Sequence, residues 1–298
     1  MESINDYLDS VCEEFQEYIN SSDDLCELKK LHFDAGNLPD YGNIHIQQLY
    51  ILRYTYAYAF EYKCMYQDLL ERLDYNAFRI LKVLSVGCGN MVDYWSLSQV
   101  LPKKSRIEYV GVDCIDWYNK FSRRKQDDVN FVQSNILDYF ETKDTIDADV
   151  YIFPKSISEF SKSDIEEICD CIKPKCIKKD EVHFLFSLRS DSGSLRRDVC
   201  NTEIIYNEML DLGFVTQDSP NKYWKLSNDI QNRKIRKLDC NFQHPQKIVG
   251  LLKELHTYCE KYDSCNERCN NLLDRYPILS CNNINWQIFT FKKDDTVC

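Results

Sequence analysis

The chain has 298 residues, 44% hydrophobic and 29% charged, which is ordinary for a globular protein with a sizeable core. Its net charge of −11 disfavours binding to nucleic acid, although basic clusters occur at 103–104, 123–125 and 233–237. No apolar run approaches the roughly 20 residues that span a membrane, and the acidic start is unlike a signal peptide. We therefore expect a cytoplasmic protein that contacts no membrane; the composition leaves the oligomeric state unknown.

The 15 cysteines are many for a chain without an export signal, so we expect mainly reduced thiols packed in the core. One group, Cys259, Cys265, Cys269 and Cys281 with His256 nearby, has two interpretations: a metal site, or thiols packed in a helical hairpin. Structural zinc usually binds pairs of cysteines with two to four residues between them, and only Cys265 and Cys269 have that spacing. We predict packed thiols and no metal.

The first part of the chain is predicted to be helical. Apolar residues recur at helical spacing over 4–19, after Ser3 as a possible N-cap. A break rich in glycine and asparagine follows at 36–43, and a long helix is predicted over 44–73. We interpret residues 1–78 as an N-terminal helical cap.

Five tyrosines recur at every fourth position of the long helix and form a ridge along it. One interpretation is a packing ridge; the other is a wall or lid whose hydroxyls reach into a pocket. The two interpretations can hold for different members of the row. The five are Tyr50, Tyr54, Tyr58, Tyr62 and Tyr66.

From residue 79, nearly continuous apolar runs of strand length alternate with helical segments. This alternation predicts an α/β fold, with a doubly wound and mainly parallel sheet covered by helices on both faces. The predicted strands are 80–86, 107–113, 129–133, 150–153 and 182–188, and the helices are 93–101, 116–125, 161–172 and 196–211. A final strand is predicted at 284–292, so we assign 79–298 to one domain with a helical, cysteine-rich insertion at about 227–283.

Polar and glycine residues stand where the predicted strands end. Ligands bind at the carboxyl ends of the strands of such a sheet. Gly87-Cys88-Gly89 follows the first strand, and glycines allow a sharp turn and a close approach to a ligand. Asp113 ends the second strand, where a carboxylate can accept both hydroxyls of a ribose, and Asn135 follows the third, where it can contact a base.

With these features, residues 80–160 resemble a class I S-adenosylmethionine-dependent methyltransferase. The matching motifs are VLSVGCG, Asp113 and Asn135. The resemblance implies a Rossmann-like fold, S-adenosyl-L-methionine as cofactor, and methyl transfer to a small-molecule or protein acceptor. By the resemblance, the cofactor-binding residues are Gly87, Cys88, Gly89, Asp113, Cys114, Ile115, Asn135 and Ile136.

Two residues depart from the family pattern. Ser85 stands where the family usually has an acid, and Met91 where it usually has a third glycine; Asp93 is a possible substitute for the acid. These departures support an alternative function, a non-catalytic interaction or assembly protein, with ribosomes or RNA as candidate partners. Whether catalysis is retained stays open at this point.

The catalytic residues are unknown from the sequence, and the candidates are Lys155, Glu159 and Tyr54. Lys155 and Glu159 follow the fourth strand, where an acceptor binds in this family. Enzymes that methylate amino groups of nucleic acids often carry Asp/Asn-Pro-Pro-aromatic there, whereas this chain has Phe-Pro-Lys-Ser, so nucleic acid is an unlikely substrate. Arg189 follows the fifth strand, either to bind a carboxylate or phosphate or within a helix-capping loop.

Overall fold

The computed structural model describes residues 2–31, 39–73, 80–143, 146–176, 178–227, 242–264, 273–280 and 283–293. The chain forms two compact units, each built from three separate segments. The helical unit contains Met1–Ala59, Ile115–Ser122 and Asp239–Cys281, and the sheet unit contains Phe60–Cys114, Arg123–Leu238 and Asn282–Cys298. Helix α2 (Ile44–Arg72) contributes residues to both. The bounds of cap and domain inferred from the sequence remain a prediction.

The helical unit contains α1 (Ile4–Ser21), the first part of α2, α7 (Gln246–Lys253) and three short 3-10 turns, at Cys26–Lys30, Leu255–Tyr258 and Tyr262–Ser264. The predicted cap of α1 is confirmed, since the Ser3 hydroxyl accepts the Asp6 N–H at 3.1 Å. One face of α1 is buried as its apolar spacing predicts, and its buried residues are Tyr7, Leu8, Val11, Cys12, Phe15 and Ile19.

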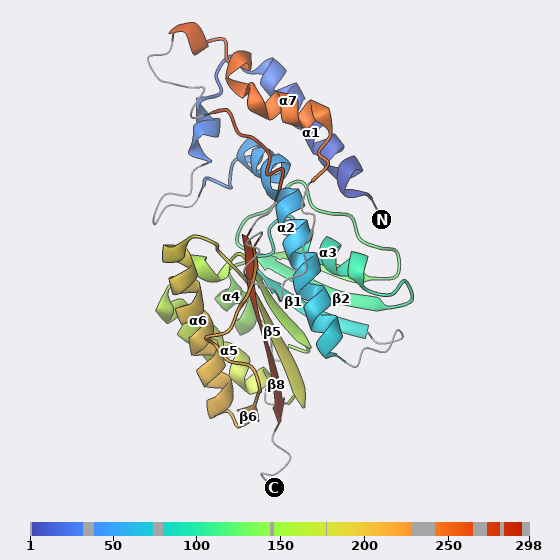
Figure 1. Cartoon of the computed structure of the whole chain (residues 1–298), viewed down its shortest axis with the longest axis vertical. Helices are drawn as coiled ribbons and strands as arrows, with labels where there is room; N and C mark the ends of the chain where they lie inside the picture. Colours follow the sequence, from blue (N-terminus) through green and yellow to red (C-terminus); the bar gives the residue numbers. More distant parts are fainter. Residues whose placement is uncertain are drawn as a thin grey trace. The chain divides into compact units, whose positions relative to one another are not determined.

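The sheet unit contains an eight-stranded sheet in the order β3-β2-β1-β4-β5-β8-β6, with β7 also paired to β8 (Figure 1). The first five strands are parallel and β8 is antiparallel to β5. The resemblance implies an antiparallel strand at the edge of the sheet for 284–292; the direction is confirmed, but β8 lies between β5 and β6 and is not the edge strand. The fold is therefore Rossmann-like and doubly wound. The strands are β1 (Ile80–Val86), β2 (Arg106–Asp113), β3 (Asp128–Gln133), β4 (Val150–Pro154), β5 (Glu181–Leu188), β6 (Phe214–Val215), β7 (Trp224–Ser227) and β8 (Asn283–Lys293).

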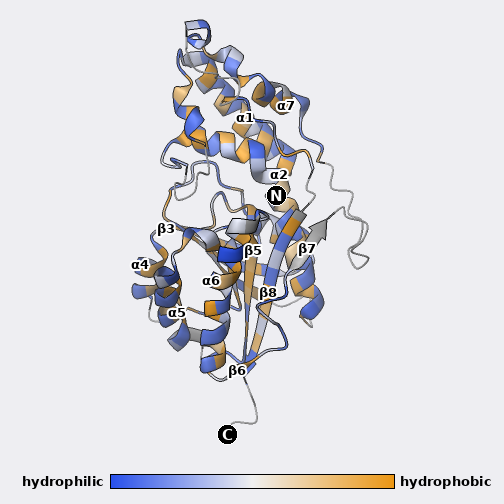
Figure 2. Cartoon of the chain, turned by 60° about the vertical axis from the view of Figure 1, so that its left-hand side comes forward, coloured by the Kyte–Doolittle hydropathy of each residue, from blue (hydrophilic) through white to orange (hydrophobic). Residues whose placement is uncertain are grey.

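Helices cover both faces of this sheet (Figure 1). α4 (Ile136–Glu141), α5 (Lys162–Cys176) and α6 (Ser192–Asp211) lie on one face, and α3 (Val92–Val100) lies on the other with the last part of α2. The central strands are apolar along their length because both of their faces are buried, and the ribbon of β5 is mostly orange in Figure 2.

The helix predicted over 116–125 is wrong. This segment is irregular, and side chains from other helices take up several of its backbone groups in place of helical hydrogen bonds. Within the helical unit, the Gln47 side chain donates to the Asp116 carbonyl at 3.1 Å and accepts the Tyr118 N–H at 2.9 Å.

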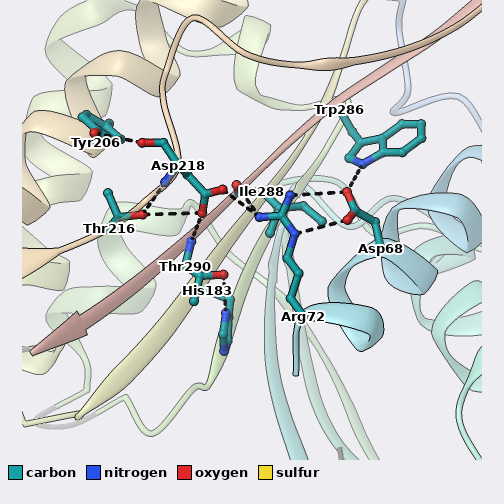
Figure 3. A network of polar contacts seen from close by, with 9 residues as sticks. All are labelled: Asp68, Arg72, His183, Tyr206, Thr216, Asp218, Trp286, Ile288 and Thr290. Carbon is teal, nitrogen blue, oxygen red and sulfur yellow. Dashed lines mark hydrogen bonds and ion pairs between the residues drawn. The ribbon is translucent and has the colours of Figure 1, made fainter. Parts of the chain in front are cut away.

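β8 pairs with β6 and β7 over short stretches only. Between these stretches, side chains form hydrogen bonds to the backbone of β8. The Asp218 carboxylate accepts the Thr290 N–H at 2.8 Å, and the Arg72 guanidinium donates to the Ile288 carbonyl at 3.2 Å (Figure 3). Arg72 also pairs with Asp218 at 2.9 Å and with Asp68 at 3.2 Å. Side chains thus take up the Thr290 N–H and the Ile288 carbonyl in place of a further strand. Beside it lies a pocket of about 500 Å³ lined by Arg72, Val215, Thr216, Gln217, Asp218, Thr290 and Lys292.

The cysteine cluster is only partly described. Cys259 is buried, and the prediction for Cys265, Cys269 and Cys281 lies outside the described residues. His256 contacts the Asp274 carboxylate through Nδ1 at 2.8 Å. Across the described ranges, no group of three His, Cys, Asp or Glu side chains is arranged to hold a metal ion. In those same ranges no helix combines the length and apolar character that crossing a membrane requires.

Candidate active site

The carboxyl ends of the parallel strands meet where the strand order reverses, between β1 and β4. Ligands of doubly wound sheets bind at such a point. The loop after β1 has the sharp turn predicted for it, because Gly87 and Gly89 both adopt left-handed φ values, of 70° and 55°. The Gly87 N–H donates to the carbonyl of Val112 at 2.8 Å, which ties this loop to the end of β2.

Asp113 completes this connection through its side chain. One of its carboxylate oxygens, Oδ2, accepts the Gly89 N–H at 2.8 Å. The predicted glycine loop and the predicted ribose acid are therefore in direct contact. Cys114, the next residue, is exposed, and partial burial and the charge of Asp113 raise the pKa of its thiol.

The loop after β4 packs directly against the glycine loop. A Cβ atom on Gly87 would lie 2.6 Å from the Cβ of Ser156, closer than real Cβ contacts. The Ser156 hydroxyl also donates to the Val86 carbonyl at 2.5 Å. Gly87 is thus required both by its φ angle and by its neighbour.

Cys88 uses the space left by another glycine. Its side chain is buried, and a Cβ on Gly111 of β2 would lie 2.7 Å from the Cys88 Sγ. The thiol therefore packs beneath the loop. Sequence reasoning missed Gly111, although a glycine inside a strand often marks such a close approach.

The departures from the family pattern are accommodated in the structure. Met91 takes the left-handed conformation, at φ 63°, and is the N-cap residue of α3. Ser85 is fully buried in β1. Asp93 is also fully buried and accepts the Tyr109 hydroxyl at 2.9 Å, and burial raises the pKa of its carboxyl to about 6. This partner favours a structural role for Asp93 over replacement of the family acid.

Asn135 and Ile136 follow β3. The Asn135 side chain is exposed and caps α4 by accepting the Leu137 N–H at 2.9 Å. Ile136 is buried in the core of the sheet unit. Two further candidates, Ile115 and Tyr54, belong to the helical unit.

Lys155 forms a buried ion pair. Its ammonium lies 2.7 Å from the Glu61 carboxylate and donates to the Leu188 carbonyl at 2.5 Å. Glu61 also accepts the Ser187 hydroxyl at 2.5 Å, and burial raises the pKa of its carboxyl against the opposing effect of Lys155. Lys155 adopts a left-handed φ of 62°, which a bulky residue rarely does. These contacts favour a positioning role for Lys155, holding the loop that packs on Gly87.

Glu159 is the best candidate for proton transfer. Its side chain is 35% exposed and lies 3.7 Å from the Arg189 guanidinium. Burial, together with the charge of Asp113, raises the pKa of its carboxyl to about 7, while Arg189 lowers it. Glu159, Asp113 and Arg189 thus interact electrostatically at the ends of three different strands. A carboxyl with a pKa near neutrality is suited to accept a proton.

Arg189 is held in place through its backbone. The buried carboxylate of Asp198 accepts the Arg189 N–H at 2.7 Å. The capping loop predicted over 190–194 is also present, since Asp191 accepts the Ser194 N–H at 2.8 Å at the start of α6. A helix-capping loop and an Arg189 side chain that binds a carboxylate or phosphate are therefore compatible with each other.

Sequence reasoning missed Glu61, Ser156 and Asp198. Glu61 carried a weak signal, because it is the one acidic residue in the segment 50–66 of the tyrosine-rich helix. Ser156 and Asp198 carried none, since serine and aspartate are common in loops and in exposed helices.

Comparisons with known proteins give structural matches. No family's sequence profile and no curated protein match the chain. A solved structure of the plantazolicin methyltransferase BpumL with a monoazolic desmethylPZN analog and SAH is similar at 12% identity and a TM-score of 0.44, over 96% of this chain and 100% of that one. A SAM-dependent methyltransferase from Archaeoglobus fulgidus is similar at 16% identity and a TM-score of 0.40, over 78% and 94%.

Human N-acetylserotonin methyltransferase in complex with SAM is also similar, at 14% identity and a TM-score of 0.39, over 71% of this chain and 64% of that one. Many of the matching structures are thus SAM-dependent methyltransferases. The mainly parallel sheet with its antiparallel β8 fits the class I methyltransferase fold.

Proposed function

We propose that this protein is an S-adenosylmethionine-dependent methyltransferase that acts on a small-molecule or protein acceptor. The observation that carries the proposal is the 2.8 Å hydrogen bond from the Gly89 N–H to Asp113. It joins the loop after β1 to the acid after β2 at the point where the strand order reverses.

The residues at this point fit the cofactor. Gly87 and Gly89 would let the backbone approach it closely, and a Cβ on Gly87 would overlap the Cβ of Ser156. By the resemblance, Asp113 would accept the ribose hydroxyls, and Cys114, Asn135 and Ile136 of the same unit would lie around the adenine. When bound, the cofactor supplies an electrophilic methyl group on a sulfonium.

The chain's own residues would orient the acceptor and take its proton. Glu159 serves as the general base in this proposal, since the pKa of about 7 leaves a large fraction of its carboxyl deprotonated at neutral pH. Arg189 would hold Glu159 and favour its charged form. Lys155 would hold the loop after β4 in position and would not take part in the reaction itself.

Calorimetry with S-adenosylmethionine and S-adenosylhomocysteine tests cofactor binding. We expect binding to the wild type and a loss in Asp113→Ala, with Asp113→Asn as a control that keeps the side-chain shape and one oxygen for the Gly89 N–H. No binding to the wild type, or equal binding in Asp113→Ala, would overturn the proposal.

The alternative function is a non-catalytic interaction or assembly protein with this fold. It is favoured by Met91, which takes a left-handed conformation where the family has glycine, and by Ser85, which brings no charge to the end of β1. It predicts little or no cofactor binding, together with a stable partner complex in a pull-down.

A further inference from the structure

The helical unit holds a connected group of aromatic rings along α2. The Tyr50 and Tyr54 rings lie 5.0 Å apart, and the Tyr54 and Tyr58 rings stack at 5.6 Å with an interplanar angle of 9°. Tyr41 and Trp117 join the group, since each ring lies within 5.5 Å of Tyr50. We name these five residues the aromatic cluster. The three tyrosines from α2 are half-buried, so the cluster is only partly covered.

Arg53 lies against this cluster and has no anionic partner among the described residues. The Arg53 guanidinium carbon lies 5.0 Å from the centroid of the Tyr54 ring. Its Nε is buried and donates to no acceptor, and no carboxylate among the described residues forms an ion pair with Arg53. A half-buried guanidinium in this state loses hydration without receiving a counter-charge, which is costly.

A second arginine lies close by. The segment that carries Arg275 runs along α2, where the Ile278 N–H donates to the Arg53 carbonyl at 3.0 Å. Burial lowers the pKa of the Arg275 guanidinium, and the charge of Arg53 lowers it further. Both arginines also act to lower the pKa of Tyr54, which burial raises. Two like charges and a phenol thus lie together in the helical unit.

The cluster contains a further donor that is not used. Trp117 is only 4% exposed, and its buried indole Nε1 has no hydrogen-bond acceptor in the part of the chain that the structure describes. Indole N–H groups usually find a partner when buried. The unused donors of Trp117 and Arg53 both require acceptor oxygens, and neither requires a donor.

We propose that the helical unit binds a planar ring compound that carries an oxyanion, a carboxylate or a phosphate. The oxyanion lies at Arg53 and Arg275, since the guanidinium fork matches both kinds of oxyanion. The ring packs against the aromatic cluster, where it stacks on the tyrosines or meets them edge to face. This proposal does not depend on methyl transfer, and it assigns a role to the half-buried members of the tyrosine ridge.

Calorimetric titration of the full chain with benzoate and with benzamide tests the charge requirement, because the two probes share a ring and differ in charge. Phenyl phosphate and inorganic phosphate form the second pair and distinguish a phosphate ligand from a carboxylate one. The variant is Arg53→Met, which keeps the aliphatic stem, and the control is the exposed Arg123→Met in the sheet unit. Trp117→Phe removes the second donor and keeps a ring.

We expect benzoate or phenyl phosphate to bind the wild type and Arg123→Met, and benzamide to bind neither. Arg53→Met should weaken binding about tenfold or more, the loss expected for a charge-assisted hydrogen bond. The Arg53 Nε–H nuclear magnetic resonance signal, identified by its loss in Arg53→Met, should shift on binding.

Equal binding of benzoate and benzamide, no binding of any anion, or unchanged affinity in Arg53→Met would overturn the proposal. If inorganic phosphate binds as tightly as phenyl phosphate, the aromatic ring of the ligand contributes nothing to affinity, and the part of the proposal that concerns the ring is overturned. Should Arg53→Met fail to fold, Trp117→Phe gives the same decision by calorimetry, because losing the indole N–H should weaken binding of the anionic probe, and unchanged affinity in Trp117→Phe would overturn the proposal.

Discussion

Gly87 lies so close to Ser156 that the Cβ atom of any other residue at this position would overlap the Ser156 side chain. Its φ of 70° is strained for other residues, and the nearest Cβ lies 2.6 Å from the position that its own Cβ would take. We expect Gly87→Ala to destabilise the protein by about 2 kcal/mol or more, through backbone strain and overlap together. Urea unfolding measures the loss.

Ser156→Gly separates the two causes. Gly87→Ala should cost less stability in the Ser156→Gly background than in the wild type, because that background removes the overlap and keeps the backbone strain; Ser156→Gly alone accounts for the lost hydrogen bond to Val86. An equal cost in the two backgrounds would mean that backbone strain alone accounts for the loss.

Glu159 predicts a pH dependence of methyl transfer. A base must be deprotonated to act, so the rate should rise as pH increases through about 7, the pKa of this carboxyl, and then level off. Glu159→Gln should lower the rate by about 100-fold or more and flatten the profile while cofactor affinity is kept. The exposed Glu166→Gln is the control. An unchanged profile in Glu159→Gln would exclude this base.

Asp93 predicts a pH dependence of stability. The pKa of its carboxyl in the folded chain, about 6, lies above the ordinary 3.8 because of burial, so the folded chain binds this proton more tightly than the unfolded chain. The free energy of unfolding should therefore fall as pH rises from about 4 to 6, by up to about 3 kcal/mol, and this contribution should stay constant above that range.

Asp93→Asn should lack this fall, because an amide does not titrate and can still accept the Tyr109 hydroxyl. The control is Asp180→Asn, whose side chain is 99% exposed. Urea unfolding at a series of pH values measures the difference. If the free energy of unfolding falls equally with pH in Asp93→Asn and in the wild type, other titrating groups cause the fall.

At the scale of elements, the parallel strands were predictable because burial on both faces requires nearly continuous apolar runs. The segment 116–125 was not, because its backbone partners come from Gln47, far away in the sequence. The ion pair between Glu61 and Lys155 was not predictable for the same reason, because the two residues are far apart in the sequence. Local patterns predict elements and strand ends, whereas contacts between distant polar side chains need the fold.

The edge of β8 supports a prediction at this scale. Asp218→Ala should free the Thr290 N–H and remove one partner of Arg72 (Figure 3). We expect hydrogen exchange at the Thr290 amide to accelerate about tenfold, corresponding to one lost hydrogen bond to a charged group. The exposed Asp211→Ala should leave exchange at Thr290 unchanged. Equal exchange in Asp218→Ala would mean that the edge is protected by other contacts.

At the scale of the whole molecule, the net charge of −11 predicts weak binding to RNA. We expect no measurable complex with single-stranded RNA at physiological salt in a filter-binding assay, since repulsion acts over the whole surface. Binding that weakens steeply as salt increases would instead support the assembly function and a local basic face.

The position of β8 in the sheet has a consequence for the order of folding. β8 lies between β5 and β6, yet it follows both in the sequence, after a segment that belongs to the helical unit. During synthesis, the edge of β5 stays open until β8 has emerged, and pairing across such a sequence separation is slow. We infer that the nascent chain passes through a stage with an unpaired apolar strand, when it is most exposed to aggregation and most dependent on chaperones.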